Sequence, residues 1–260
     1  MSPRILVRRP SPRLADGELT HIDRQPVDAD LALTQWQGYV GAFAENGWDV
    51  TEIAPADDHP DGVFVEDTVV MFGDLAVLTS PGTASRRGEV ASTAATLASL
   101  AVGLGIEVAR IAEPGHLDGG DVLKVGRTAY VGLTSRTDEA GIEQLRALLE
   151  PRGWKVVAVP VSKVLHLKSG VTALPDGTVV GYQPLVDDPT VYPRFLPVPE
   201  EHGTAVVDLG ENTVLMSSDA PRTAELYAGR GLRVVTVPIT EFEKLEGCVT
   251  CLSVRMRGLT

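Results

Sequence analysis

The sequence lacks three features that would place it quickly in a class. Only two cysteines occur in 260 residues, Cys248 and Cys251, and a pair three positions apart cannot staple a domain of this size. A reducing compartment, the cytoplasm, is therefore expected. No run of lysine and arginine is present, which argues against nucleic acid and anionic membranes as partners. No segment has ~18 consecutive apolar residues, so no membrane-spanning helix is predicted.

The balance of charge and hydrophobicity indicates an acidic globular protein. The formal net charge is −12 and the isoelectric point about 4.8. A cationic small-molecule partner suits this charge, although an acidic surface is also common in proteins without one. Hydrophobic residues make up 43% of the chain, enough to bury a large core as one domain or two. The first four residues, Met1 to Arg4, lack the long apolar core of a signal peptide.

A short box recurs four times: glycine, an apolar residue, any residue, valine, two further residues, and valine or isoleucine. Its copies begin at Gly47, Gly105, Gly153 and Gly231. Glycine suits the left-handed residue that ends a helix, and the valine-rich run suits the strand that follows. The boxes therefore predict four helix-to-strand junctions, in which the helices occupy 30–46, 86–104, 138–152 and 221–230. The last helix has Asp219 placed as an N-cap and Pro221 in its first turn.

Paired apolar runs joined by turn residues lie between the boxes and predict β-hairpins. The pairs are 63–72 with 75–78, 121–123 with 129–131, 171–174 with 179–180, and 205–207 with 214–216. Strand, hairpin partner, helix and strand thus repeat about every 50 residues, which indicates a repeat architecture closed around an axis.

The spacing of the boxes sets the number of units. Gly153 and Gly231 are 78 residues apart, too far for one unit, so two units are predicted there, with a degraded helix near 191–196. The resulting α/β ring has five units and closes where the cysteine-containing strand at 249–254 meets 4–7. An ordinary two-layer α/β domain is the alternative.

Charged or reactive residues interrupt the apolar context at equivalent points, where each unit's inner strand begins. They are Glu66-Asp67, Asp118 with Asp121, His166 and Cys251. Equivalent positions of a pseudo-symmetric ring converge on its axis, where buried carboxylates need a compensating charge. A cationic ligand would supply that charge.

Taken singly, these residues could also be purely structural. Glu66 and Asp67 could form a loop-facing pair, the stretch from Asp118 to Asp121 could be a tight turn, and His166 could be a hydrogen-bonded core histidine.

The two cysteines could serve a different chemistry from nucleophilic catalysis. Cys248-x-x-Cys251 could be a redox pair or half of a zinc site. A redox pair normally begins a helix, however, and no second cysteine pair completes four zinc ligands. A cysteine, histidine and carboxylate nucleophile system is the interpretation that uses all of these residues together.

Six runs of the sequence together resemble the dimethylarginine dimethylaminohydrolase family. They are DGVFVED at 61–67, SPGTASRR at 80–87, LDGGDVL at 117–123, VGLTSRT at 131–137, LHLKS at 165–169 and TCLSV at 250–254. They occur in order over nearly the whole chain, and the resemblance is weakest at 10–30 and 185–215. It implies the pentein fold, a five-bladed α/β propeller, as a single catalytic domain over 1–260. It also implies hydrolysis of Nω-methylated L-arginine to citrulline and methylamine or dimethylamine, with no metal or organic cofactor.

The resemblance also implies roles for individual residues. Cys251 would be the nucleophile, His166 the proton donor and later base, and Asp118 the carboxylate that orients it. The implied substrate contacts are Asp61, Glu66 and Asp67 for the cationic groups, Arg86 and Arg136 for the α-carboxylate, and the backbone of Leu19 and Leu245. Cys248 matches no catalytic position. These residue types suit the chemistry, because a thiolate is a strong nucleophile toward a delocalised guanidinium carbon and a histidine can protonate the departing amine.

Two kinds of alternative remain. A related pentein enzyme would keep the fold and act on arginine or agmatine, as a deiminase or an amidinotransferase. A non-catalytic pentein would bind a macromolecule instead, but then Cys251, His166 and Asp118 would have no reason to be intact. The expected partner is a small cationic amino acid, with no nucleic acid and no membrane, and a homodimer is left open.

Overall fold

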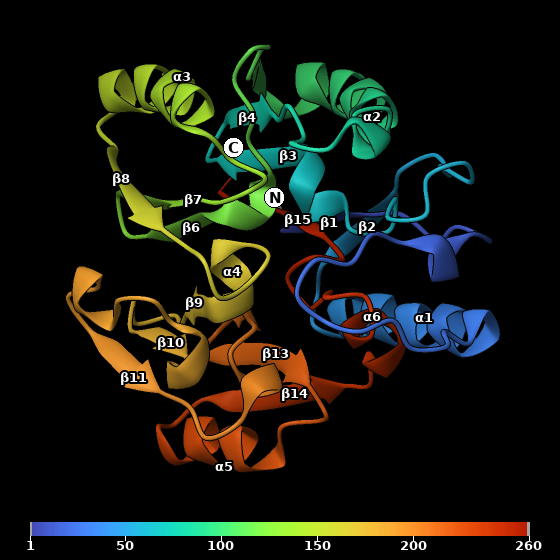
Figure 1. Cartoon of the computed structure of the whole chain (residues 1–260), viewed down its shortest axis with the longest axis vertical. Coiled ribbons are helices and arrows are strands. Elements are labelled where there is room, and N and C mark those ends of the chain that lie inside the picture. Colours follow the sequence, from blue (N-terminus) through green and yellow to red (C-terminus); the bar gives the residue numbers. More distant parts are fainter. Residues whose placement is uncertain (1, 259–260) are drawn as a thin grey trace.

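The computed structural model describes residues 2–258 and contains five small sheets around a common axis (Figure 1). Each sheet has three strands, in the orders β15-β1-β2, β3-β4-β5, β6-β7-β8, β9-β10-β11 and β12-β13-β14. The five-unit closed α/β ring predicted from the repeat is confirmed. Within residues 2–258, no helix combines the length and the apolar character that crossing a membrane requires.

The strands are short, and most were anticipated by the hairpins and boxes. They are Arg4–Val7 (β1), Asp49–Glu52 (β2), Val69–Phe72 (β3), Leu75–Leu78 (β4), Glu107–Arg110 (β5), Val122–Val125 (β6), Thr128–Leu133 (β7), Lys155–Pro160 (β8), Val171–Ala173 (β9), Val179–Gly181 (β10), Phe195–Pro197 (β11), Val206–Gly210 (β12), Thr213–Ser217 (β13), Arg233–Val237 (β14) and Val254–Met256 (β15). The α-helices are Ala29–Glu45 (α1), Glu89–Leu104 (α2), Glu139–Leu149 (α3), Leu167–Gly170 (α4), Pro221–Gly229 (α5) and Thr240–Glu243 (α6).

Each unit follows one plan. An inner strand pairs antiparallel with a middle strand, as Val69 of β3 does with Leu78 of β4. The middle strand pairs parallel with an outer strand, as Leu75 does with Glu107 of β5. Parallel neighbours need a long crossover, and α1, α2, α3 and α5 supply it at the periphery of the ring (Figure 1). Inner strands therefore face the axis, and whatever precedes them lies near it.

The box glycines end the crossovers as predicted. Gly105 has φ 63°, and its N–H donates to the Ala101 carbonyl, so the chain leaves α2 through a left-handed residue and enters β5 two residues later. Gly47, Gly153 and Gly231 also have positive φ. A side chain at such a position would strain the backbone, which explains why the boxes begin with glycine.

Two local predictions were wrong. The fourth unit has no helix at 191–196; two 3₁₀ turns, Gln183–Leu185 and Pro189–Val191, make its crossover, and 195–197 is strand β11. Pro193 lies inside the predicted segment and restricts Tyr192, the residue before it, to the extended conformation that it has, with φ −98° and ψ 128°. Asp219 does not cap α5 but lies beside His202, with Oδ2 3.3 Å from Nδ1, while Pro221 is the first residue of the helix as predicted.

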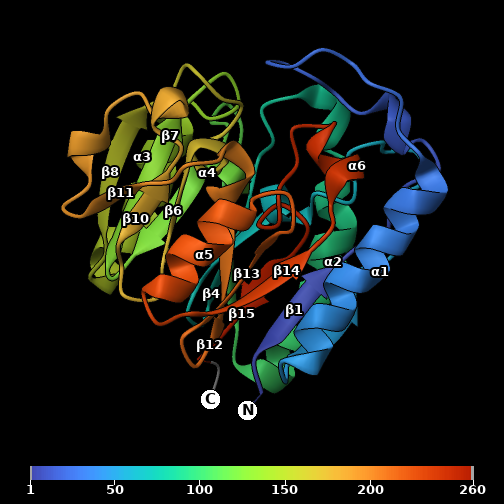
Figure 2. The same ribbon diagram turned by 90° about the horizontal axis from the view of Figure 1, so that it is seen from below.

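The first sheet closes the ring, because it combines both ends of the described chain. β15 pairs antiparallel with β1, so that Ile5 lies opposite Arg255, and the two strands run side by side in Figure 2. A third local prediction, the strand at 249–254, was wrong in all but its last residue: 249–252 form a turn, and β15 begins at Val254. Side chains donate hydrogen bonds to backbone carbonyls that a longer strand would pair with a neighbouring strand. The Tyr39 hydroxyl donates to the Val249 carbonyl, and Arg255 donates to the Thr250 carbonyl.

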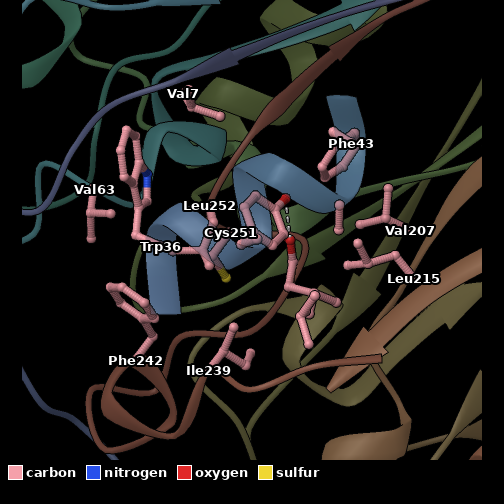
Figure 3. Packing of buried hydrophobic residues seen from close by; sticks show 14 of the residues in the cluster. Val7, Trp36, Phe43, Val63, Val207, Leu215, Ile239, Phe242, Cys251 and Leu252 are labelled. Atoms are coloured by element: carbon pink, nitrogen blue, oxygen red, sulfur yellow. Dashed lines mark hydrogen bonds between the residues drawn. The ribbon is translucent and has the colours of Figure 1, made fainter. Parts of the chain in front are cut away.

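A hydrophobic cluster holds the cysteine turn against α1. Cys251 and Leu252 lie with Trp36 and Phe242 on one side and Phe43 and Val207 farther along (Figure 3). Within this cluster the Tyr39 hydroxyl is fully buried and bonds both the Val249 carbonyl, at 2.8 Å, and the Ser253 hydroxyl, at 2.7 Å. One tyrosine of the crossover helix thus fixes the turn on both sides of Cys251.

Replacing Tyr39 with Phe should therefore destabilise the protein. The change keeps the ring and leaves the buried Val249 carbonyl without its donor, which costs about 1–3 kcal/mol. Urea denaturation should show a lower midpoint with an unchanged slope. Tyr182→Phe is the matched control, because the Tyr182 side chain is half-buried and its hydroxyl makes no hydrogen bond within residues 2–258. Equal midpoints for the two variants would contradict the role of the Tyr39 hydroxyl.

Candidate active site

Three short helical turns and the cysteine turn precede inner strands and bring the polar residues together. The turns are Val65–Thr68 (η2), Gly119–Asp121 (η4) and α4, which come directly before β3, β6 and β9. A small cavity of about 20 Å³ lies among them. Of the residues predicted for the site, Asp61, Asp67, Arg86, Arg136, His166, Leu245 and Cys251 line it. Equivalent positions of the ring therefore converge, as the repeat predicted.

Cys251 presents its thiol to this cavity with 7% of the residue exposed. Its Sγ lies 3.3 Å from Sγ of Cys248 and accepts the Cys248 backbone N–H at 3.4 Å. Contact with Cys248, burial and the nearby carboxylates of Glu66 and Asp67 all raise the pKa of Cys251 well above its usual value. The resting sulfur is therefore a thiol.

His166 lies directly before α4, between two carboxylates. Its Nε2 is 3.0 Å from Oδ2 of Asp118, and its Nδ1 is 3.9 Å from Oδ1 of Asp67. Burial alone would lower the pKa of His166, but the charges of Asp67, Asp121 and Asp118 raise it to about 9. The imidazole is therefore a proton-bearing cation at neutral pH, oriented by Asp118.

The glycine pair of η4 allows this close approach. A Cβ on Gly119 would lie 2.0 Å from the Glu66 carbonyl, and one on Gly120 would lie 2.7 Å from the His166 ring. The Gly120 N–H also donates to Oδ1 of Asp67 at 2.8 Å. Asp121 braces the histidine's own turn, because its Oδ1 accepts the Leu167 N–H at 2.9 Å. The run Asp118-Gly-Gly-Asp121 is thus a turn whose two carboxylates and bare backbone build the site.

Arg86 forms a buried ion cluster at the base of the cavity. Its NH1 lies 2.6 Å from Asp67 Oδ2, and its Nε and NH2 bond the two oxygens of Glu89 at 3.0 and 2.8 Å. Burial alone would raise the pKa of Asp67, but His166 and Arg86 lower it to about 2. Asp67 is therefore a fixed anion, and Arg86 is already engaged by two carboxylates.

Glu66 points away from the cavity. Its carboxylate lies 2.6 Å from Lys168 Nζ, 2.5 Å from Arg255 NH2 and 2.9 Å from the Thr250 hydroxyl. Successive residues of a short helical turn face different directions, so Asp67 reaches the cavity while Glu66 reaches its far side. This position argues against the predicted contact of Glu66 with the substrate. Glu66 instead positions Thr250, the residue before Cys251.

A strap between Leu14–Asp16 (η1) and α1 covers the cavity. In Figure 2 the segment arches over the end of the ring that lies away from the start of β1. Its Glu18 N–H donates to Asp61 Oδ2 at 3.1 Å, and the Glu18 carboxylate lies 3.1 Å from Arg136 NH2. Burial raises the pKa of Asp61. Leu19 is half-buried against the hydrophobic cluster and lies outside the lining of the cavity.

The strap is also fastened on its other side. The Glu246 carboxylate accepts the N–H groups of Thr20 at 2.6 Å and His21 at 3.0 Å. Glu246 has φ 59°, an unusual left-handed conformation for a glutamate, directly after Leu245. Leu245, Glu246 and the cysteine turn therefore form one wall that holds the strap.

The sequence did not predict several of these contacts. Glu89 carried a weak signal, because it lies three positions after Arg86 at the start of a helix. Glu18, Lys168 and Arg255 gave none, since they act through partners far away in the chain.

Among the residues that the structure describes, two groups of side chains bring three metal-ligating atoms within 4.8 Å of one another. In the first group, Asp67, Asp118 and His166, the charges and hydrogen-bonding atoms already have partners through the contacts described above. The second group is His202, Asp219 and Glu243, beside a separate cavity of about 160 Å³.

The chain resembles characterised proteins over nearly its full length. No family model matches. It is 60% identical over 258 residues to the N(G),N(G)-dimethylarginine dimethylaminohydrolase of Streptomyces coelicolor, covering 99% of this chain and 98% of that protein. The crystal structure of the Pseudomonas aeruginosa enzyme in complex with citrulline is 34% identical, with a TM-score of 0.90 over 98% of this chain and all of that one. A dimethylarginine dimethylaminohydrolase adduct with S-methyl-L-thiocitrulline is 33% identical, with the same TM-score and coverage.

The sequence identity to these relatives is higher than a shared fold alone would produce, and it extends over whole chains of matching length. The five-unit ring is accordingly the pentein fold, and the resemblance carried by the six sequence runs is confirmed. The chain belongs to the dimethylarginine dimethylaminohydrolase family.

Proposed function

We propose that this protein hydrolyses Nω-methylated L-arginine to L-citrulline and methylamine or dimethylamine, with Cys251 as the nucleophile. The observation that carries the proposal is the convergence of the Cys251 thiol, the His166–Asp118 pair and the Asp67 carboxylate on one cavity. The ligands of the solved relatives, citrulline and an S-methyl-L-thiocitrulline adduct, support it, since both carry the carbon skeleton of the expected product.

Charge complementarity orients the substrate in the cavity. The guanidinium binds at Asp67, the buried anion that lines the cavity beside His166. Asp61 and the backbone of Leu245, which line the same cavity, receive the α-amino group together with the backbone of Leu19, which lies in the strap outside that lining. Arg136 binds the α-carboxylate, so Glu18 must leave Arg136 when the substrate enters. Arg86 adds positive charge at the same end while holding Asp67 in place.

The reaction then proceeds in two halves. The bound cation stabilises the Cys251 thiolate, and the thiol proton passes to solvent because His166 is already protonated. The thiolate sulfur then forms a bond to the guanidinium carbon. The C–N bond to the methylated nitrogen breaks as His166 gives its proton to the departing amine, which leaves a thiouronium on Cys251. Water then adds to the same carbon and gives its proton to His166. The C–S bond breaks, and the remaining proton of the added hydroxyl passes to the departing sulfur, which releases citrulline and restores the thiol.

The proposal includes the wider setting of the enzyme. The partner is a small cationic amino acid, which the negative net charge and the buried carboxylates suit. We keep the single catalytic domain over 1–260, a homodimer as the assembly to be tested, and a cytoplasmic location, which the two free cysteines support.

The direct test is citrulline release from asymmetric dimethylarginine, monomethylarginine and arginine, measured side by side. The methylated substrates should react and arginine should react poorly. Cys251→Ser should abolish turnover because a hydroxyl is far less nucleophilic than a thiol, and Cys248→Ser should keep most of it. Mass spectrometry of an acid-quenched reaction should find the adduct on Cys251. Faster citrulline release from arginine would identify a deiminase instead, and an adduct on Cys248 would contradict the assigned nucleophile.

Replacing Arg136 with Ala should raise KM for methylarginine by about 10- to 150-fold, since a lost charge-assisted contact costs roughly 1.5–3 kcal/mol. A decarboxylated methylarginine should respond little to the same change. Arg86→Ala should lower kcat as well, because Asp67 loses its counter-charge. Arg87→Ala is the control, as this arginine is exposed and pairs with Glu113. Equal damage toward the decarboxylated compound would assign Arg136 a structural role.

The resting thiol predicts a distinctive pH dependence of alkylation. Iodoacetamide reacts with thiolates, and the pKa of Cys251 is raised, so inactivation of the free enzyme should have a midpoint above about 8.5. The Cys248→Ser variant should be used, because Cys248 also reacts with the reagent. Burial and the carboxylates keep the pKa of Cys251 raised in that variant. A midpoint below about 7 would mean a preformed thiolate–imidazolium pair and would contradict this part of the mechanism.

A further inference from the structure

The two cysteines of the chain occupy opposite ends of a single turn. The Cys251 N–H donates to the Cys248 carbonyl at 3.0 Å, and this turn brings the two Sγ atoms to 3.3 Å. A disulfide needs about 2.05 Å, a distance that small side-chain rotations can reach when the backbone already pairs the residues. We propose that Cys248 and Cys251 form a reversible disulfide under hydroperoxide, with Cys248 as the residue that is oxidised first. The loss of activity that follows rests on the proposed function, whereas formation of the bond does not.

The two sulfurs face different cavities and touch through the wall between them. Cys251 lines the small substrate cavity, with Asp67 and His166. Cys248 is half-buried and lines the larger cavity of about 160 Å³, whose wall includes Ile239 and Val249. A neutral oxidant the size of water can therefore reach Cys248 without entering the substrate cavity. Cys248 takes part in no step of the proposed hydrolysis, but its position makes it the sulfur that such an oxidant reaches first.

The charges around the pair place the shared proton on Cys251. A hydrogen bond from the Cys251 thiol lowers the pKa of Cys248, against the opposing effect of burial, and the Thr250 hydroxyl and N–H add to the lowering. The contact with Cys248, burial and the charges of Glu66 and Asp67 raise the pKa of Cys251, which keeps the proton on its sulfur. The accessible sulfur is thus also the more nucleophilic one at neutral pH.

The chemistry balances with hydrogen peroxide as the oxidant. The Cys248 thiolate attacks one peroxide oxygen, so that an S–O bond forms, the O–O bond breaks and hydroxide leaves; the product is a sulfenic acid. The sulfur of Cys251 then attacks Cys248, the S–S bond forms, the S–O bond breaks, and hydroxide leaves as water with the Cys251 proton. Both sulfurs are oxidised by one electron each, and the peroxide is reduced to water. An added dithiol reverses the reaction by thiol–disulfide exchange.

The test exposes reduced, desalted enzyme to a few-fold excess of hydrogen peroxide, blocks remaining thiols with N-ethylmaleimide and digests with trypsin. Cleavage after Lys244 and Arg255 yields one peptide that contains both cysteines. We expect this peptide to lack two hydrogen atoms and to carry no maleimide, and citrulline release to disappear and return with dithiothreitol. Cys248→Ser should form no disulfide and be inactivated about tenfold more slowly near neutral pH, because its remaining thiol has a raised pKa.

The outcomes separate this proposal from the proposed function. Maleimide on both cysteines after peroxide treatment would overturn the disulfide, as would a sulfinic acid on Cys251 beside an alkylated Cys248. Inactivation of Cys248→Ser at the wild-type rate would overturn the order of attack. If reduced wild-type enzyme releases no citrulline, the proposed function fails, and the mass of the peptide still reports on the disulfide.

Discussion

Burying several carboxylates near one axis is the constraint on which the rest of this structure depends. An unpaired buried charge costs several kcal/mol, so each anion needs a cation within reach. Asp67 has Arg86, Glu66 has Lys168 and Arg255, and Asp118 has the imidazolium of His166. The five-unit ring makes this arrangement possible because every unit delivers a short polar turn to the same place. The cations come from different units, which ties the charge balance to the closure of the ring.

The same charges decide the resting protonation state of Cys251, the proposed nucleophile. A cysteine beside a histidine often ionises early, but here the histidine pairs with Asp118 and Asp67 rather than with the sulfur. The thiol keeps its proton among anions, and the field around it reverses only when a cation binds. In the proposed mechanism the charge of the substrate is therefore what stabilises the Cys251 thiolate.

The sequence predicted a feature correctly where that feature depends on residues close together in the chain. Helix ends, hairpins and the ring order followed from glycines and apolar periodicity, and the motif runs anticipated His166 beside Asp118. It failed where the answer depends on distant partners. Glu66 and Asp67 are neighbours with similar chemistry, and only the contacts of Glu66 with Lys168 and Arg255 show that it faces away from the cavity. The stretch at 249–254 likewise has the composition of a strand but is mostly a turn, because the Tyr39 hydroxyl and Arg255 take the carbonyls of Val249 and Thr250.

The sheet that directly follows Cys251 in the chain differs from the other four in how it must assemble. β3-β4-β5 and its counterparts are built from neighbouring sequence, whereas Ile5 of β1 meets Arg255 of β15 across 250 positions. Contacts between such distant segments lose the most chain entropy and form late. A partly folded chain can thus contain four complete sheets while the turn that holds Cys251 is still unformed. The turn with Cys251 is then completed only when β15 pairs with β1, so a chain arrested before that step has most of its sheets but no complete site.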